Sequence, residues 1–377
     1  MTNDSFFNTG VFQEALKEVG FRMDAASQRN ADVFGKTWYG KHFTMAGDPK
    51  TREEFTTLLG QYTLSYAAST INRNSAPPVR PTDGFGQVKA EMLTFAHTYP
   101  MQAEDIRAIA EYMRYNNRAS DRRRVVEYII KRLWNVRERA INGVNERLDN
   151  IILTMLSNKG TYTFTAENDP NSPFIGKTIN FGFDEGHADG VDNDWSAANR
   201  ETVDVIADLV EAVSQMDVTP ELMLMDRATL NFMLTTSILK KYINGTDNAS
   251  RPIVQTQLNA ELQRLGLPAI EVVEKKTRIL DGTSEKTIVP WLSGKILFVP
   301  GSNFGTIEHL ITDHDLGIDD PGVTYAKYNN IEVSSWTQGL KEGTHHTEFV
   351  SASLTGTPVW SNVLDSYELD TLPSTRN

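Results

Sequence analysis

The clearest pattern of apolar and polar positions lies in residues 120–158. Apolar side chains recur there at spacings of three and four, and charged residues occupy the opposite face. The apolar positions are Val125, Ile129, Leu133, Val136, Ala140, Val144, Leu148, Ile151 and Met155. This period predicts a single amphipathic helix of roughly 55 Å. Such a helix is several times longer than the average helix of a globular protein.

The residues before this helix show strand-like and turn-like patterns. Apolar and polar residues alternate from 62 to 66, and a stretch rich in turn-forming residues follows at 72–84. The pattern predicts a long two-stranded excursion with a broad tip within residues 60–105. Residues 1–58 show no sustained period, so we expect them to lack a core of their own or to lie along another surface.

Shorter elements are predicted after the helix. They are a hairpin from 161–165 and 177–183, an amphipathic helix near 198–215, a buried strand at 222–225, a helix through 230–242, a helix at about 252–265 that ends at Gly266, strands at 269–274 and 295–299, and mostly strand and loop to Leu372. Helices and strands are interspersed without a regular βαβ alternation. This order favours an α+β fold over a doubly wound sheet.

Composition narrows the class of protein. The chain has 377 residues, of which 40% are hydrophobic and 23% charged, as in ordinary globular proteins. Its longest apolar runs are too short for a transmembrane helix. The absence of cysteine excludes disulfides, thiolate metal sites and thiol nucleophiles, and favours a reducing cytoplasm. The net charge of −12 argues against non-specific DNA binding by the whole chain.

Four segments invite a chemical interpretation, and each has a simpler one. The acidic loop 184–194 lacks EF-hand spacing, so we interpret it as a solvated loop. Residues 312–315 and 345–348 contain histidines without a His-x-x-x-His spacing or a third ligand, which favours polar contacts. Gly301–Gly305 lacks the Gly-Lys-Ser/Thr ending of a phosphate loop and is interpreted as a turn. We therefore predict no catalytic, cofactor-binding or metal-binding residue. A metal-dependent hydrolase is a remote alternative.

Basic residues cluster at the start of the long helix although the chain is acidic overall. The candidates for contacts to a neighbouring subunit or to packaged DNA are Arg118, Arg122, Arg123, Arg124 and Arg132, together with Arg80 in the tip of the excursion. The cluster is equally compatible with a solvated helix face that carries pairs such as Glu127–Lys131. Charge alone does not separate these possibilities.

Several stretches carry a resemblance to a known family through their order along the chain. They are Pro77-Pro78-Val79-Arg80-Pro81, the segment Leu148–Thr163, the hairpin end Ile179-Asn180-Phe181-Gly182, Thr219–Arg227 before a helix, Gly294–Thr306, Pro358-Val359-Trp360 and Leu364–Leu372. Over roughly residues 55–372 this order resembles the lambda-type major capsid protein E family of tailed bacteriophages.

The resemblance implies an α+β fold of the Hong Kong 97 capsid type. The segments that it implies are an N-terminal arm at 1–58, an extended loop at 59–105, a peripheral domain at 106–218 with a spine helix at 120–158, an axial domain at 219–335, and a return to the peripheral domain at 336–377.

It also implies a structural subunit and not an enzyme. Copies would self-assemble as pentamers and hexamers into an icosahedral head that encloses double-stranded DNA on its inner face. The implied partners are scaffolding, portal and decoration proteins, with no membrane and no cofactor. The implied location is the virion capsid, assembled in the cytoplasm of a host bacterium. The same fold would suit an encapsulin-like compartment shell, which is the alternative.

Overall fold

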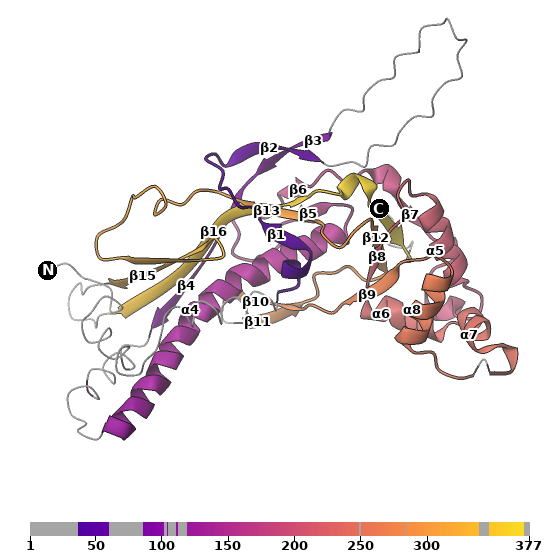
Figure 1. Ribbon diagram of the computed structural model, residues 1–377, viewed down its shortest axis with the longest axis horizontal. Helices are drawn as coiled ribbons and strands as arrows, with labels where there is room; N and C mark the ends of the chain where they lie inside the picture. Colours follow the sequence, from indigo (N-terminus) through magenta and orange to yellow (C-terminus); the bar gives the residue numbers. More distant parts are fainter. Residues whose placement is uncertain are drawn as a thin grey trace, which may run out of the picture. The chain divides into compact units, whose positions relative to one another are not determined.

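The structure, a computed structural model, describes residues 37–59, 86–101, 104, 111, 119–248, 250–282, 284–338 and 347–372. It divides the chain into two compact units. The first comprises Met1–Phe55, Glu91–Asn150 and Thr306–Pro358, and the second Thr56–Ala90, Ile151–Gly305 and Val359–Asn377. Helices and strands are mixed without βαβ alternation, so the predicted α+β class is confirmed (Figure 1).

The helices are α4 (Ala119–Leu156), α5 (Val205–Ser214), α6 (Arg227–Thr235), α7 (Ser237–Asn244) and α8 (Gln255–Arg264). The strands of the first unit's sheet are β1 (Phe43–Met45), β4 (Leu93–Met101), β13 (Gly305–His309), β14 (Thr324–Tyr328), β15 (Ile331–Gln338) and β16 (Thr347–Trp360). The strands of the second unit's sheet are β7 (Ala188–Gly190), β8 (Leu222–Asp226), β9 (Ala269–Val273), β12 (Lys295–Val299) and β17 (Tyr367–Asp370). Three two-stranded pairs complete the set: β2 (Glu54–Leu59) with β3 (Gly86–Glu91), β5 (Thr161–Thr163) with β6 (Thr178–Asn180), and β10 (Thr277–Asp281) with β11 (Ser284–Ile288).

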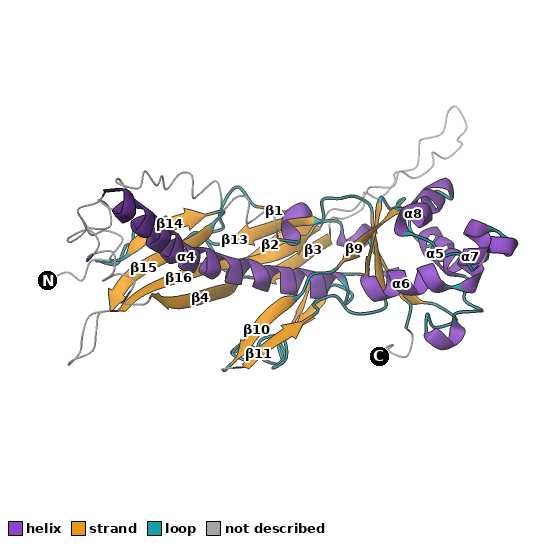
Figure 2. Ribbon diagram, turned by 90° about the horizontal axis from the view of Figure 1, so that it is seen from below, coloured by secondary structure: helices purple, strands orange, loops and turns teal. Residues whose placement is uncertain are grey.

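The first unit is built on a six-stranded sheet in the order β1-β13-β16-β15-β14, with β4 also paired to β16. Along β16, buried residues alternate with partly exposed ones, because successive side chains of a strand point to opposite faces. Val350, Ala352 and Leu354 belong to the buried face. Helix α4 runs along this sheet (Figure 2), where the Arg137 guanidinium donates to Ser335 of β15.

Helix α4 confirms the predicted spine. It has 38 residues, which corresponds to about 57 Å, and its predicted apolar positions Ala140, Val144 and Leu148 are buried. The helix ends at Leu156 because the backbone turns left-handed at Lys159 and Gly160, with φ of 49° and 62°. Gly160 N–H then donates to the Met155 carbonyl, a common helix stop.

Residues 37–50 follow the second of the two expectations for residues 1–58, because they lie along another surface of the same chain. Trp38 and Tyr39 are buried, and their backbone N–H groups donate to the Asp149 carboxylate of α4 at 3.2 and 2.8 Å. The Tyr39 hydroxyl donates to Asn145 at 2.6 Å. Strand β1 then joins the sheet beside β13. Charge-assisted hydrogen bonds to a buried carboxylate hold this segment on its own chain.

The predicted excursion at 60–105 is not a single element, because its later part belongs to the sheet of the first unit. Residues 93–101, which we expected to lie within it, form β4 and pair with β16 from Leu93↔Gly356 to Met101↔Glu348. Before them, β2 and β3 form a two-stranded ribbon. The remainder, residues 60–85, lies outside the described residues, as do residues 1–36.

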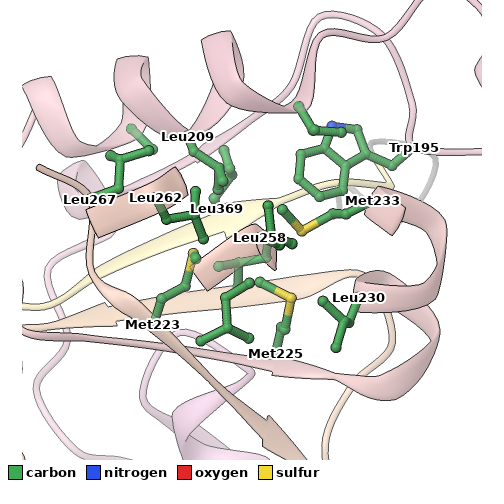
Figure 3. Close-up of a cluster of buried hydrophobic side chains, with 14 of the residues drawn as sticks. Trp195, Leu209, Met223, Met225, Leu230, Met233, Leu258, Leu262, Leu267 and Leu369 are labelled. Atoms are coloured by element: carbon green, nitrogen blue, oxygen red, sulfur yellow. The ribbon is translucent and has the colours of Figure 1, made fainter. Parts of the chain in front are cut away.

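The second unit has a mixed five-stranded sheet in the order β7-β17-β12-β8-β9. The outer pairs, β7 with β17 and β8 with β9, are parallel, whereas β12 is antiparallel to both of its neighbours. Helices α5 to α8 contribute to the core on one face (Figure 3). The side chains labelled there are Trp195, Leu209, Met223, Met225, Leu230, Met233, Leu258, Leu262, Leu267 and Leu369.

Local hydrogen bonds explain where the helices of this unit depart from the prediction. Helix α5 begins at Val205 because the Asp204 side chain accepts from the N–H groups of Ile206 and Ala207. The helix predicted through 230–242 is two helices, because Thr236 adopts extended backbone between α6 and α7. Helix α8 stops before Gly266, whose φ is 76°, as predicted.

Candidate functional site

The structure does not describe the side chains of the arginines that were predicted to contact a neighbouring subunit or packaged DNA. Arg80 and Arg118 lie outside the described residues. Arg122, Arg123, Arg124 and Arg132 lie in α4, and their side chains also fall outside the description. Their roles therefore stay predictions.

Arg137 is an arginine of α4 with a described hydrogen bond to the sheet, and the prediction did not include it. It is 1% exposed, and its guanidinium donates to the Ser335 hydroxyl at 3.1 Å. Burial lowers the pKa of Arg137, while a hydrogen bond with Tyr328 and the charge of Glu348 act in the opposite direction. Its sequence signal is a charged residue on the apolar stripe of the helix. Arg137 therefore fastens α4 to the sheet and is not available to DNA.

The histidine-containing segment 312–315 forms a local polar network. His314 Nδ1 lies 2.7 Å from Asp319 Oδ1, and its ring stacks on Tyr325. Asp315 pairs with Lys327 at 2.5 Å, and this contact lowers the pKa of the Asp315 carboxyl. These side chains pair with one another within the first unit. The segment therefore makes the polar contacts that we expected.

The acidic loop 184–194 is partly an edge strand and not entirely a solvated loop. The Asp184 side chain accepts from Gly186 N–H, and Ala188–Gly190 then form β7, parallel to β17. The hydrogen bond to the Asp184 carboxylate and the short backbone pairing with β17 together fix this segment. Among the described residues, no group of three or more His, Asp or Glu side chains is placed to hold a metal ion. In the same part of the chain, no helix is long and apolar enough to cross a membrane.

Exposed apolar side chains gather on two hairpins of the second unit. Leu280 and Val289 lie on and just after the β10–β11 hairpin, and Leu280 is 56% exposed. Ile175 belongs to the loop of the β5–β6 hairpin. The Asn171 side chain donates to the Leu280 carbonyl at 3.4 Å, so the two hairpins are neighbours. Exposed apolar patches on small hairpins are typical of protein contact surfaces.

A buried ionic cluster lies on β12 and β17. Lys295 Nζ is 2.9 Å from Asp370 Oδ2 and 3.5 Å from Glu368 Oε1. Glu368 Oε2 accepts from the backbone N–H of Lys159 at 2.7 Å. Burial raises the pKa of Glu368 in spite of the hydrogen bond from Lys159 and the charge of Lys295. The cluster combines an amine and two carboxyl groups away from water.

The described fold and surfaces define an α+β protein with one very long helix, two separate sheets and exposed apolar hairpins. No protein-family model matches the chain, and no curated protein matches it.

Solved structures that are similar to the chain include phage proteins and an encapsulin. One is a protein assigned as the capsid protein of a prophage of E. coli CFT073, with 13% identity over 76% of this chain and 79% of that one, and a TM-score of 0.48. Another is the capsid of Myoviridae phage XM1, with 11% identity, coverage of 88% and 90%, and a TM-score of 0.43. A third is an encapsulin complex from Synechococcus elongatus PCC 7942, with 12% identity, coverage of 89% and 86%, and a TM-score of 0.32.

Proposed function

We propose that this chain has the Hong Kong 97 capsid fold and is the major capsid protein of a tailed bacteriophage. One observation carries the proposal, namely the order of its elements. A two-stranded ribbon is followed by a 38-residue helix, and the two sheets are completed by strands from late in the chain. This is the order that the sequence resemblance implied for extended loop, spine, peripheral domain and axial domain.

The exposed surfaces support a subunit that buries area on copies of itself. Leu316 and Ile318 of the first unit are exposed, and Ile318 is 65% accessible. Leu280 and Val289 of the second unit are exposed as well. Association buries such side chains and gains free energy in proportion to the apolar area removed from water. The net charge of −12 discourages indiscriminate clumping, so specific contacts decide assembly.

The finer parts of the proposal concern partners and location. Copies form pentamers and hexamers of an icosahedral head in the cytoplasm of the host bacterium, and the virion capsid encloses double-stranded DNA. Scaffolding, portal and decoration proteins take part. Arg80, Arg118, Arg122, Arg123, Arg124 and Arg132 contact a neighbouring subunit or the packaged DNA. Membership of the lambda-type family belongs to the same proposal, and so do the five segments, except that the proposed extended loop is limited to the stretch between β2 and β3 because residues 93–101 belong to β4.

The test is to express the chain, alone and with candidate scaffolding protein, and to image it by negative stain. We expect rings or closed particles. A species that stays monomeric by light scattering at high concentration under both conditions would contradict the proposal.

The contents of particles isolated from the native source separate two shell functions. Nuclease-protected double-stranded DNA supports a phage head, whereas a protein cargo supports an encapsulin-like compartment. Metal analysis addresses the hydrolase alternative, because that enzyme would carry a stoichiometric divalent ion.

A further inference from the structure

The buried cluster on β12 and β17 has the composition and spacing needed to form a covalent bond within the chain. Lys295 and Asp370 lie directly opposite each other on antiparallel strands. Side chains at such positions face each other at short range. Lys295 Nζ is 2.9 Å from Asp370 Oδ2, so the nucleophilic nitrogen already lies beside the carboxyl group that it would attack.

Water is largely excluded from this pair. The side chain of Lys295 is 10% exposed, that of Asp370 7% and that of Glu368 1%. An ion pair loses much of its hydration in such a place. The amine and the carboxyl group therefore face each other with little bulk water competing for either of them.

Glu368 lies where a proton carrier is needed. Its Oε1 is 3.5 Å from Lys295 Nζ and is a buried oxygen without a hydrogen-bond partner, while Oε2 is held by Lys159 N–H. Burial raises the pKa of Glu368, so this carboxyl group holds a proton more readily than an exposed glutamate does. The carboxyl group is thus fixed in place with one oxygen directed towards the amine.

The neighbouring backbone holds the pair in register. Asp370 Oδ1 accepts from Leu372 N–H at 2.9 Å, and Thr371 N–H donates to the Gly294 carbonyl at 2.9 Å. The Leu372 side chain lies so close to Gly294 that a β-carbon there would approach it to 2.7 Å. A fixed, close pair reacts with the advantage of an intramolecular reaction.

We propose that Lys295 and Asp370 form an intramolecular isopeptide bond, with Glu368 as the proton-transferring group. One proton passes from the Lys295 ammonium to the Asp370 carboxylate, which leaves an amine and an acid. The amine nitrogen attacks Asp370 Cγ, and a nitrogen–carbon bond forms. Glu368 donates its proton to the departing oxygen and recovers one from the nitrogen. The carbon–oxygen bond breaks and one water leaves, so no oxidant or cofactor is required.

This reaction is a single event within one chain and does not depend on the proposed shell function. The bond would join β12 to β17 across 75 residues of sequence. A cross-link of this kind restricts the unfolded chain, as a disulfide does. In a protein without cysteine it would be a chemically inert means of fixing the last strand of the sheet.

Intact mass spectrometry of the denatured full-length chain is the direct test. We expect a mass lower than that of the sequence by one water. Proteolysis should then yield a branched peptide that contains both Lys295 and Asp370. A full sequence mass, with both residues recovered in linear peptides, overturns the proposal without any variant.

Variants identify the source of a water loss, because Asp-Gly sites such as Asp281-Gly282 can also lose water by cyclisation. Lys295→Met should restore the full mass, and persistence of the water loss in this variant overturns the proposal.

Glu368→Gln should slow formation of the branched product after refolding by at least about 100-fold. The matched control is Glu274→Gln, which removes an exposed carboxylate of the same unit and should leave the rate unchanged. A normal rate in folded Glu368→Gln overturns the role of Glu368.

Discussion

Buried charged side chains each hold together segments that are far apart in sequence. Asp149 binds the segment around Trp38, and Arg137 binds β15. Glu368 binds the chain just after α4 through the Lys159 N–H. A buried charge without partners would cost free energy, so its burial makes these contacts necessary. The same contacts are strong because one partner in each is charged.

Replacement of Asp149 by alanine should detach the segment around Tyr39. The substitution leaves the N–H groups of Trp38 and Tyr39 without their carboxylate acceptor inside the first unit. We expect the free energy of unfolding to fall by about 3 kcal/mol, because hydrogen bonds to charged groups contribute roughly 1.5–3 kcal/mol each. Urea denaturation measures the change. Glu138→Gln, on the same helix, should change it by less than about 0.5 kcal/mol. Equal effects would contradict the assigned role.

His309 should make the first unit sensitive to acid. The side chain is 1% exposed, and its Nδ1 is a buried atom without a hydrogen-bond partner. Burial lowers the pKa of His309, and the charge of Lys327 lowers it further, while Glu308 and Asp315 oppose them. Below pH about 6.5 the unfolded state therefore binds a proton that the folded state does not. The free energy of unfolding should fall as the pH is lowered through this region.

The measurement is denaturant unfolding at several values between about pH 7.5 and 5. In His309→Gln the decline should be shallower than in the unaltered chain. A residual slope is expected from His97, because burial and the charge of Arg147 lower its pKa as well. His187→Gln serves as the control, since His187 lies at the end of a short surface turn. An unchanged slope in His309→Gln would show that this side chain is not responsible.

At the scale of elements, Gly305 allows the close approach of two backbone segments. A β-carbon at Gly305 would lie 1.9 Å from the Val359 carbonyl oxygen and 3.0 Å from Ser361 N. Backbone atoms cannot move aside as a flexible side chain can, so Gly305→Ala should lower the free energy of unfolding by about 3 kcal/mol. Gly301→Ala is the matched control, because its β-carbon would have no neighbour nearer than 3.8 Å. Thermal or urea unfolding compares the two, and similar stability would contradict the assigned close approach.

Elements with a long internal pattern were predictable from the sequence. The spine carries its apolar period over nearly forty residues, so one or two residues that break the pattern do not hide it. Strands β10 and β11 were not among the predicted elements, because they are mostly exposed and show little apolar alternation. Strand β7 was missed for a similar reason, since backbone pairing with β17 holds three residues that have no strand-like pattern.

Contacts between distant residues could not be predicted. Nothing near Trp38 and Tyr39 indicates that Asp149, about a hundred residues later, accepts their N–H groups. The pairing of Lys295 with Asp370 likewise follows only from the register of β12 and β17. The arginine cluster could be recognised from the sequence, but charge alone does not distinguish a solvated face from a contact with a neighbouring subunit or with DNA.

At the scale of the whole molecule, a shell subunit has to contact its copies through surfaces that one chain leaves uncovered. Residues 37–50 and β4 pack on their own unit, so they are not free to extend onto a neighbouring copy. The extended loop of the proposal is therefore confined to the stretch between β2 and β3. Residues 60–85, with Arg80, are the part of the chain whose removal tests assembly separately from folding.

Replacement of residues 60–85 by a short Asn-Gly turn should separate these two properties. Strands β2 and β3 already pair, so a tight turn can join Leu59 to Gly86. We expect the variant to unfold cooperatively with the stability of the unaltered chain, since the described cores of both units remain. It should nevertheless form no closed particles in negative stain, because the proposed function assigns the contact with a neighbouring subunit to residues 60–85.

A second variant distinguishes the length of the loop from its side chains. A Gly-Ser segment of equal length in place of residues 60–85 keeps the number of residues and removes the apolar and basic side chains, so it should also fail to assemble. Arg80→Ala alone should weaken assembly and shift its onset to higher protein concentration in light scattering, because the proposed contact of Arg80 with a neighbouring subunit is lost. Particles of normal size from the Asn-Gly variant would show that subunits meet through other surfaces. The exposed residues of the β5–β6 and β10–β11 hairpins would then be the next to alter, since they combine exposure with apolar character.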